Sequence, residues 1–378
     1  MERVGSCGRA YCRSAAAAFV VAGCLSMCGG CIWPSPLAEV DAPRLGRAIG
    51  GRVAVVYSRR YQIDLGGFEK LHSFDIHKYE RIYLALVRAG DVRAQEVFVP
   101  AEATMQQILR VHTPEYLATL GDPAAVGRYL EAPQVKALPA KAIDAGILRA
   151  FRYATGGTVL AARLALRYGV AVNLAGGYHH AKPDAGEGFC IYNDIAVAIR
   201  AMQDEGLSKR ALVVDLDVHQ GNGTAVCFAG DKRVFTFSMH EGGIYPVPKA
   251  RSDLDVELSA GTDDEEYMRL LASTLQAIIE KFRPDLVIFQ AGCDTLAGDP
   301  LAHLAMTPEG IVQRDAMVID ECVRRAIPVV MVLGGGYSKD AWKAQYASVR
   351  RTLRKHGGRR GRWPLPAQTP SGKLKKGF

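Results

Sequence analysis

The sequence carries ALVVDLDVHQGNG at residues 211–223, where an apolar run ends in three polar side chains. A continuous run of valine and leucine is typical of a strand that is buried on both faces of a parallel sheet. Asp215, Asp217 and His219 stand at its end, just before two glycines. Ligands of open α/β sheets bind at the carboxyl ends of the strands. We therefore predict that these side chains lie at the functional edge of such a sheet.

Further apolar runs alternate with amphipathic stretches of helical length along the chain. Strands are expected at 52–58, 170–174, 233–238, 285–290 and 328–333, and helices at 144–167, 194–205, 264–281 and 308–325. Thr262 and Glu265 have the spacing of a capping box for the third of these helices. Strict alternation of strand and helix predicts parallel pairing with right-handed crossovers. The fold class is therefore α/β, a single three-layer α/β/α domain with a mostly parallel central sheet.

The size and charge of the chain indicate one large domain and argue against specific nucleic acid binding. The chain has 378 residues, of which 49% are hydrophobic, enough for one large domain. Ten of the lysines and arginines fall at 350–378 without an acidic residue, and residues 1–23 carry a net charge of +2. The total of +8 therefore leaves 8 − 10 − 2 = −4 for the rest. A mildly acidic body argues against specific nucleic acid binding. The basic tail at 351–378 is expected to be solvated, with an acidic partner or membrane surface as the alternative.

The N-terminus has the pattern of a targeting segment. Three arginines precede AAAAFVVAG at residues 15–23, an apolar run too short to span a bilayer. The following VAGC, ending at Cys24, resembles the bacterial lipoprotein signal, in which the cysteine is lipidated. We predict a signal-like segment at 1–24, a linker at 25–51 and a catalytic domain at 52–350. This implies an exported, membrane-anchored lipoprotein. The alternatives are an ordinary signal peptide, or a start codon placed too far upstream of a cytoplasmic enzyme.

Four glycine-containing fragments each follow a predicted strand. They are NLAGGYHHAKPDAGEGFC at 173–190, DLDVHQGNG at 215–223, QAGCDTLAGDP at 290–300 and VLGGGYSKD at 332–340. Asp217 and His219 are two residues apart, which places both side chains on one face of an extended segment. Asp294 from a neighbouring strand end completes an Asp-His-Asp set. Such a set with open positions is typical of a catalytic divalent-metal site, and zinc is the commonest ion.

Acid–base groups are also present in these fragments. His179 and His180 follow a glycine turn that can aim both imidazoles inward, as a general base and a general acid beside a metal. Each imidazole needs a partner that fixes its tautomer, and Asp215 and Asn222 are the candidates. Tyr337 follows three glycines and can place its phenol where an oxyanion develops.

The four fragments together resemble the zinc-dependent histone deacetylase family. That family also contains acetylpolyamine amidohydrolases and bacterial acetoin-utilisation proteins. The resemblance covers about residues 52–350. Class IV is the most similar subgroup, on the evidence of YSRRYQIDLGGFEKLHSFDIHKYE at 57–80, LRVHTPEYL at 109–117, GDKRV at 230–234 and the asparagine of HQGNG.

The resemblance implies a role for each motif residue. Asp217, His219 and Asp294 would hold one zinc ion, and His180, paired with Asn222, would be the general base for the attacking water. His179, paired with Asp215, would be the electrostatic or acid partner, and Tyr337 would hydrogen-bond the substrate carbonyl. Gly188 and Phe189 would line the channel that holds the lysine stem. A structural potassium ion is implied near Asp215 and the backbone around His219 and Ser238.

The expected activity is hydrolysis of an N-acyl-amine, most directly deacetylation or deacylation of N6-acyl-lysine in proteins or peptides. An acetylpolyamine or other small-molecule amidohydrolase is the alternative, long-acyl removal is a further one, and an inactive binding module is a minor one. Ureohydrolases, which share the architecture, need carboxylates for a second metal where this chain has Gly221 and Gly292. The sequence does not indicate acyl-chain length or oligomeric state.

Overall fold

The computed structural model describes residues 52–358 except residues 64, 66, 68, 70 and 71. The signal-like segment with Cys24, the linker and the chain after residue 358 lie outside the described residues, so what we predict for them stays a prediction. All described residues belong to one compact unit. None of the helices in this described part is both long enough and apolar enough to span a membrane.

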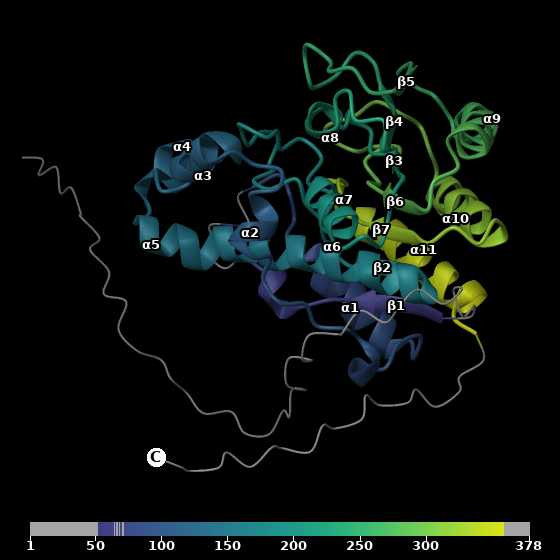
Figure 1. Cartoon of the computed structure of the whole chain (residues 1–378), viewed down its shortest axis with the longest axis horizontal. Coiled ribbons are helices and arrows are strands. Elements are labelled where there is room, and N and C mark those ends of the chain that lie inside the picture. Colours follow the sequence, from purple (N-terminus) through teal and green to yellow (C-terminus); the bar gives the residue numbers. More distant parts are fainter. Residues whose placement is uncertain (1–51, 64, 66, 68, 70–71, 359–378) are drawn as a thin grey trace, which may run out of the picture. The chain divides into compact units, whose positions relative to one another are not determined.

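Seven parallel strands form the central sheet, in the order β1-β2-β7-β6-β3-β4-β5 (Figure 1). They are β1 Arg52–Val56, β2 Gly169–Asn173, β3 Ala211–Asp215, β4 Val234–Glu241, β5 Leu254–Leu258, β6 Leu286–Gln290 and β7 Val329–Val332. The α/β fold class is confirmed, and the sheet of the described residues is wholly parallel. The predicted strands and helices occur in the predicted order, but β5 was missed. It follows β4 with no helix between them, so the alternation is not strict.

The helices cover both faces of the sheet. They are α1 Lys78–Arg88, α2 Met105–Ile108, α3 Pro114–Thr119, α4 Pro123–Tyr129, α5 Ala140–Ile143, α6 Arg149–Tyr168, α7 Asp194–Asp204, α8 Asn222–Cys227, α9 Asp264–Phe282, α10 Pro308–Arg324 and α11 Ala341–His356. Successive strand residues face opposite sides. Ala54 and Val56 therefore pack with α6 and α7 in one apolar core, whereas Val55 packs with α1, α9, α10 and α11 in the other. Figure 1 shows α7 on one side of the sheet and α9 and α10 on the other.

Two local predictions were wrong, and each has a physical reason. The strand β5 was missed because LDVEL contains two acidic residues and lies, partly exposed, at the edge of the sheet. The capping box before α9 does not form. Asp263 caps this helix by accepting a hydrogen bond from the Glu266 amide, while the Thr262 hydroxyl donates to the Ser259 carbonyl.

One helix boundary also differs from prediction. A π-helical turn at Asp144–Leu148 precedes α6, so the α-helix proper begins five residues later than predicted. The last described helix, α11, ends at His356. It is fixed there by ion pairs of Arg350 and Arg354 with Asp91.

A buried arginine joins the two loops that carry the Asp-His-Asp motif. Arg314 on α10 is fully buried and pairs with Asp315 at 2.8 Å. Its guanidinium also donates to the Leu216 carbonyl, just after β3, and to the Thr295 hydroxyl, after β6. One side chain therefore fixes the distance between the ends of two adjacent strands.

Replacing Arg314 with methionine should destabilise the fold strongly. The change leaves the Asp315 carboxylate buried without its partner, and breaking a buried pair in this way costs about 3–5 kcal/mol. Urea unfolding should show this as a lower free energy of unfolding. Arg324→Met, which removes an exposed pair with Glu321, should cost less than about 1 kcal/mol. Equal stability of the two variants would contradict the role given to Arg314.

Candidate metal centre

Each of the four glycine-containing fragments follows a strand, and these four strands are neighbours in the sheet. The order β2-β7-β6-β3 puts residues 173–190, 332–340, 290–300 and 215–223 side by side. Because the strands are parallel, all four loops lie at one edge. The sheet order therefore brings together motifs that lie far apart in the sequence.

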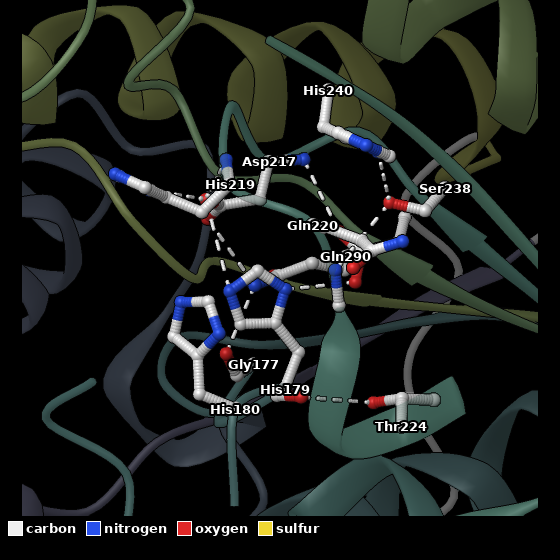
Figure 2. Close-up of polar contacts among 12 residues, drawn as sticks. Gly177, His179, His180, Asp217, His219, Gln220, Thr224, Ser238, His240 and Gln290 are labelled. Atoms are coloured by element: carbon white, nitrogen blue, oxygen red, sulfur yellow. Dashed lines mark hydrogen bonds and ion pairs between the residues drawn. The ribbon is translucent and has the colours of Figure 1, made fainter. Parts of the chain in front are cut away.

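The predicted metal ligands meet at this edge. Asp217, His219 and Asp294 are buried, and their candidate ligand atoms lie within 4.8 Å of one another. Nδ1 of His219 is 3.2 Å from Oδ1 of Asp217 and 3.1 Å from Oδ2 of Asp294. Figure 2 shows Asp217 and His219 converging on this point.

Backbone amides orient both carboxylates. Oδ2 of Asp217 accepts a hydrogen bond from the Gly335 amide at 2.8 Å, and Oδ1 of Asp294 accepts one from the Val218 amide at 2.9 Å. The other oxygen of each group is left facing His219. Burial, together with the negative charge of Asp217, raises the pKa of Asp294 above its ordinary value. Two buried carboxylates at such close range are stable together only beside a positive charge, so the donor set fits a divalent cation.

Glycines exclude the side chains that a second metal would need as ligands. A Cβ on Gly292 would collide with the Asp217 carboxylate, and a Cβ on Gly221 would collide with that of Asp215. These are the two positions where a ureohydrolase would need further carboxylates. The structure therefore supports a centre for one ion.

The two adjacent histidines lie together beside the metal ligands. Their ring centroids are 4.0 Å apart, and Figure 2 shows the two imidazoles side by side below Asp217. Nδ1 of His179 is 2.8 Å from Oδ2 of Asp215, and Nδ1 of His180 is 2.7 Å from Oδ1 of Asn222. Each imidazole thus has the partner that the sequence suggested for it.

The two imidazoles differ in charge. Burial alone lowers the pKa of His179, but the carboxylates of Asp215 and Asp217 outweigh it and raise that pKa to about 9. Burial lowers the pKa of His180 well below its ordinary value, and its neighbours His179 and His219 lower it further. At neutral pH the pair therefore combines a charged and a neutral imidazole.

The predicted substrate-contacting residues lie around the same point. The Tyr337 ring is 6.1 Å from the His219 ring and 5.9 Å from the Phe189 ring. Gly188 has φ +52° and lies so close to His180 that a Cβ there would collide with the imidazole. Phe189 itself has φ 66°, a conformation that is unfavourable for a side-chain-bearing residue and is typical of functional sites.

An apolar cavity of about 310 Å³ lies next to the histidine pair. One end is bounded by His179, His180 and Tyr337. The rest of the lining is mostly hydrocarbon and includes Leu130, Val135, Leu138, Ile147, Ala150 and Phe151, with Glu69, His72 and Gln134 among its polar residues. Much of this wall is supplied by residues 130–151, which the motifs do not cover.

Three positioning residues were not predicted as site residues. Lys78 on α1 is buried and donates hydrogen bonds to the carbonyls of Gly334 and Gly335, at 2.6 and 2.9 Å, so it fixes the loop before Tyr337. Asp299 accepts from the Tyr337 amide at 2.8 Å. Asp194 accepts hydrogen bonds from the Gly177 and Tyr178 amides, in the turn before His179. Its position at the start of α7 was the only feature of the sequence that set it apart.

The potassium site stays a prediction. Oδ1 of Asp215 accepts a hydrogen bond from the Asp217 amide at 3.3 Å, and the Ser238 hydroxyl lies 2.9 Å from Nδ1 of His240 (Figure 2). These hydrogen bonds do not identify an ion.

Comparisons with known proteins agree with the geometry. The histone deacetylase domain family matches residues 72–353. An uncharacterized protein of Picosynechococcus is 41% identical over 269 residues, 71% of this chain and 88% of the relative. Histone deacetylase 2 of Arabidopsis thaliana is 39% identical over 293 residues, 77% and 76% of the two chains. The crystal structure of the HDA15 HD domain is 25% identical, with a TM-score of 0.65 over 80% of this chain and 91% of that one.

The parallel sheet and its buried Asp-His-Asp set define a deacetylase-like hydrolase. Together with the match over residues 72–353, they show that the chain belongs to the histone deacetylase family. The names of these relatives do not carry a class IV designation, so that finer assignment stays a prediction.

Proposed function

We propose that the chain is a zinc-dependent deacylase that hydrolyses N6-acyl-lysine in peptides or proteins, with the class IV resemblance as its finer placement. The observation that carries this proposal is the buried set of Asp217, His219 and Asp294 directly beside the His179–His180 pair. A potassium ion near Asp215 would be an additional structural ion. The inactive binding module is disfavoured because the motif residues are all present and lie together.

Bound at Asp217, His219 and Asp294, zinc would polarise the amide carbonyl and make water more acidic. The side chains around it would move the protons. His180, neutral and held at Nδ1 by Asn222, would accept the proton of the attacking water at Nε2. His179, kept charged by Asp215, would stabilise the developing negative charge and supply a proton toward the leaving amine. The Tyr337 hydroxyl would donate a hydrogen bond to the carbonyl oxygen as it becomes tetrahedral.

The cavity favours an acyl group larger than acetyl. Hydrocarbon walls bind an alkyl chain at about 0.8 kcal/mol for each buried methylene group. A polyamine would instead place ammonium groups along its length, and a mostly hydrocarbon lining stabilises these less well than an alkyl chain. An acetylpolyamine remains the second candidate, because residues outside the cavity could bind its free amine.

The proposal is tested with zinc-loaded protein and four substrates of equal concentration: acetyl-lysine, octanoyl-lysine and myristoyl-lysine peptides, and N-acetylputrescine. We expect peptide deacylation, with kcat/KM rising with chain length. A higher kcat/KM for N-acetylputrescine than for every peptide would reject the lysine substrate. Protein purified without chelators that contains no zinc would instead favour the binding module.

Filling the cavity should change the chain-length preference. Leu138→Trp places a larger ring in the apolar wall, and overpacking of this kind costs about 1–3 kcal/mol, roughly a 5- to 150-fold loss in kcat/KM for myristoyl-lysine. Acetyl-lysine should be affected much less. Leu109→Trp, at an exposed position that does not line the cavity, is the control. If both substrates lose activity equally in Leu138→Trp, the acyl chain does not occupy this wall.

A further inference from the structure

The partner of His180 is an amide, and an amide has two ends of nearly equal shape. If the Asn222 oxygen faces Nδ1 of His180, that nitrogen carries the proton and Nε2 is free to accept another. If the Asn222 NH₂ group faces Nδ1, the proton must sit on Nε2, and His180 cannot act as a base there. The orientation of one amide therefore decides whether the proposed mechanism can operate.

A carboxylate on the neighbouring loop determines this orientation. The Asn222 Nδ2 group donates a hydrogen bond to Oε1 of Glu187. An ionised carboxylate can only accept hydrogen bonds, so it selects the NH₂ end of the amide and turns the oxygen toward His180. The distance of 2.7 Å between Nδ1 of His180 and Oδ1 of Asn222 completes this chain of contacts.

Two further donors keep Glu187 an acceptor. Lys182 Nζ donates a hydrogen bond to Oε2 of Glu187 at 2.6 Å. The Tyr245 hydroxyl donates to Oε1 at 3.1 Å. Burial and the charge of Glu187 raise the pKa of this phenol far above its ordinary value, so it remains a donor. The Tyr245 ring is also 5.0 Å from the His180 ring, so the same tyrosine contacts both His180 and Glu187.

The backbone holds Glu187 in place. The next residue, Gly188, packs directly on the His180 imidazole, and the Cys190 amide donates to the Glu187 carbonyl at 2.9 Å. Glu187 is thus anchored on the same loop as His180 but reaches it only through Asn222.

We propose that Glu187 is a positioning residue that, through the Asn222 amide, fixes the Nδ1–H tautomer of His180. The inference rests on the proposed function, because it concerns the residue assigned as general base. His180 contacts an amide, not a carboxylate, at position 222. The carboxylate of this hydrogen-bonded chain is that of Glu187, which contacts the Asn222 amide.

The test compares Glu187→Gln, Asn222→Asp and the double variant as zinc-loaded proteins. The amide introduced at position 187 can donate as well as accept, so it no longer selects one end of Asn222. We expect kcat for an acyl-lysine peptide to fall about ten- to hundredfold in Glu187→Gln, with KM nearly unchanged. Glu115→Gln, an exposed change on α3, is the control.

The double variant should recover most of the lost kcat. The carboxylate introduced at position 222 can only accept from His180, and the new amide at position 187 can donate to that carboxylate. In Asn222→Asp alone, the carboxylates at positions 222 and 187 would face each other. We therefore expect a lower kcat for this single variant than for the double variant.

A second measurement does not depend on activity. Nitrogen-15 NMR of histidine-labelled protein distinguishes the two neutral tautomers, and the His180 signals are assigned with His180→Gln. We expect an Nδ1–H tautomer in the wild type and the double variant, and a mixture in Glu187→Gln.

The outcomes separate this inference from the proposed function. A wild type that cleaves no acyl-amine overturns the function, whereas the NMR result still decides whether Glu187 fixes the tautomer. An active wild type whose Glu187→Gln variant keeps both its kcat and its tautomer overturns the role of Glu187. A loss of kcat with no change of tautomer and no recovery in the double variant overturns it as well.

Discussion

Asn in place of Asp294 is expected to remove zinc from the protein and to lower kcat/KM by about a thousandfold or more. Asp294 supplies one of the two charged oxygens beside Nδ1 of His219, and a neutral amide oxygen is a much weaker ligand for a divalent ion. The loss is large because carbonyl polarisation and water activation both depend on the same ion. Zinc content by mass spectrometry and kcat/KM on an acyl-lysine peptide are the two measurements.

The matched control for this prediction is Asp184→Asn. Asp184 is an exposed aspartate on the loop that carries the histidine pair, and it does not belong to the donor set. Its replacement changes the charge of the protein by the same amount. Full zinc occupancy and full activity in Asp294→Asn would show that the ion is not held where we place it.

Most of the fold could be predicted because the strands have a distinctive composition. β3 and β6 are continuous apolar segments between polar turns, and burial on both faces of the sheet requires that pattern. The edge strand β5 faces solvent in part, so its sequence is not constrained in the same way. The cap of α9 was wrong by one residue because Thr262 and Asp263 are both competent caps, and only the path of the incoming chain decides between them.

The candidate site could be predicted to a similar extent, and for a related reason. The polar residues at strand ends are conspicuous against apolar neighbours, so Asp217 and Asp294 stand out in the sequence. Lys78 and Glu187 do not, because a lysine in a helix and a glutamate in a loop are usually solvated. Their contacts with the Gly334 carbonyl and the Asn222 amide follow from tertiary packing between distant segments. The cavity wall at residues 130–151 could not be predicted for the same reason.

His180→Ala is expected to lower kcat by about a hundred- to ten-thousandfold, the range typical of a general base. The effect should exceed that of His179→Ala. His180 is the neutral imidazole of the pair and has an amide for a partner, whereas Asp215 keeps His179 charged and therefore unable to accept a proton. Neither residue belongs to the proposed donor set, so both variants should retain zinc. Measurements of kcat at saturating peptide, with zinc content for each variant, separate the two roles. A larger loss in His179→Ala at equal zinc content would reverse the assignment of base and acid partner.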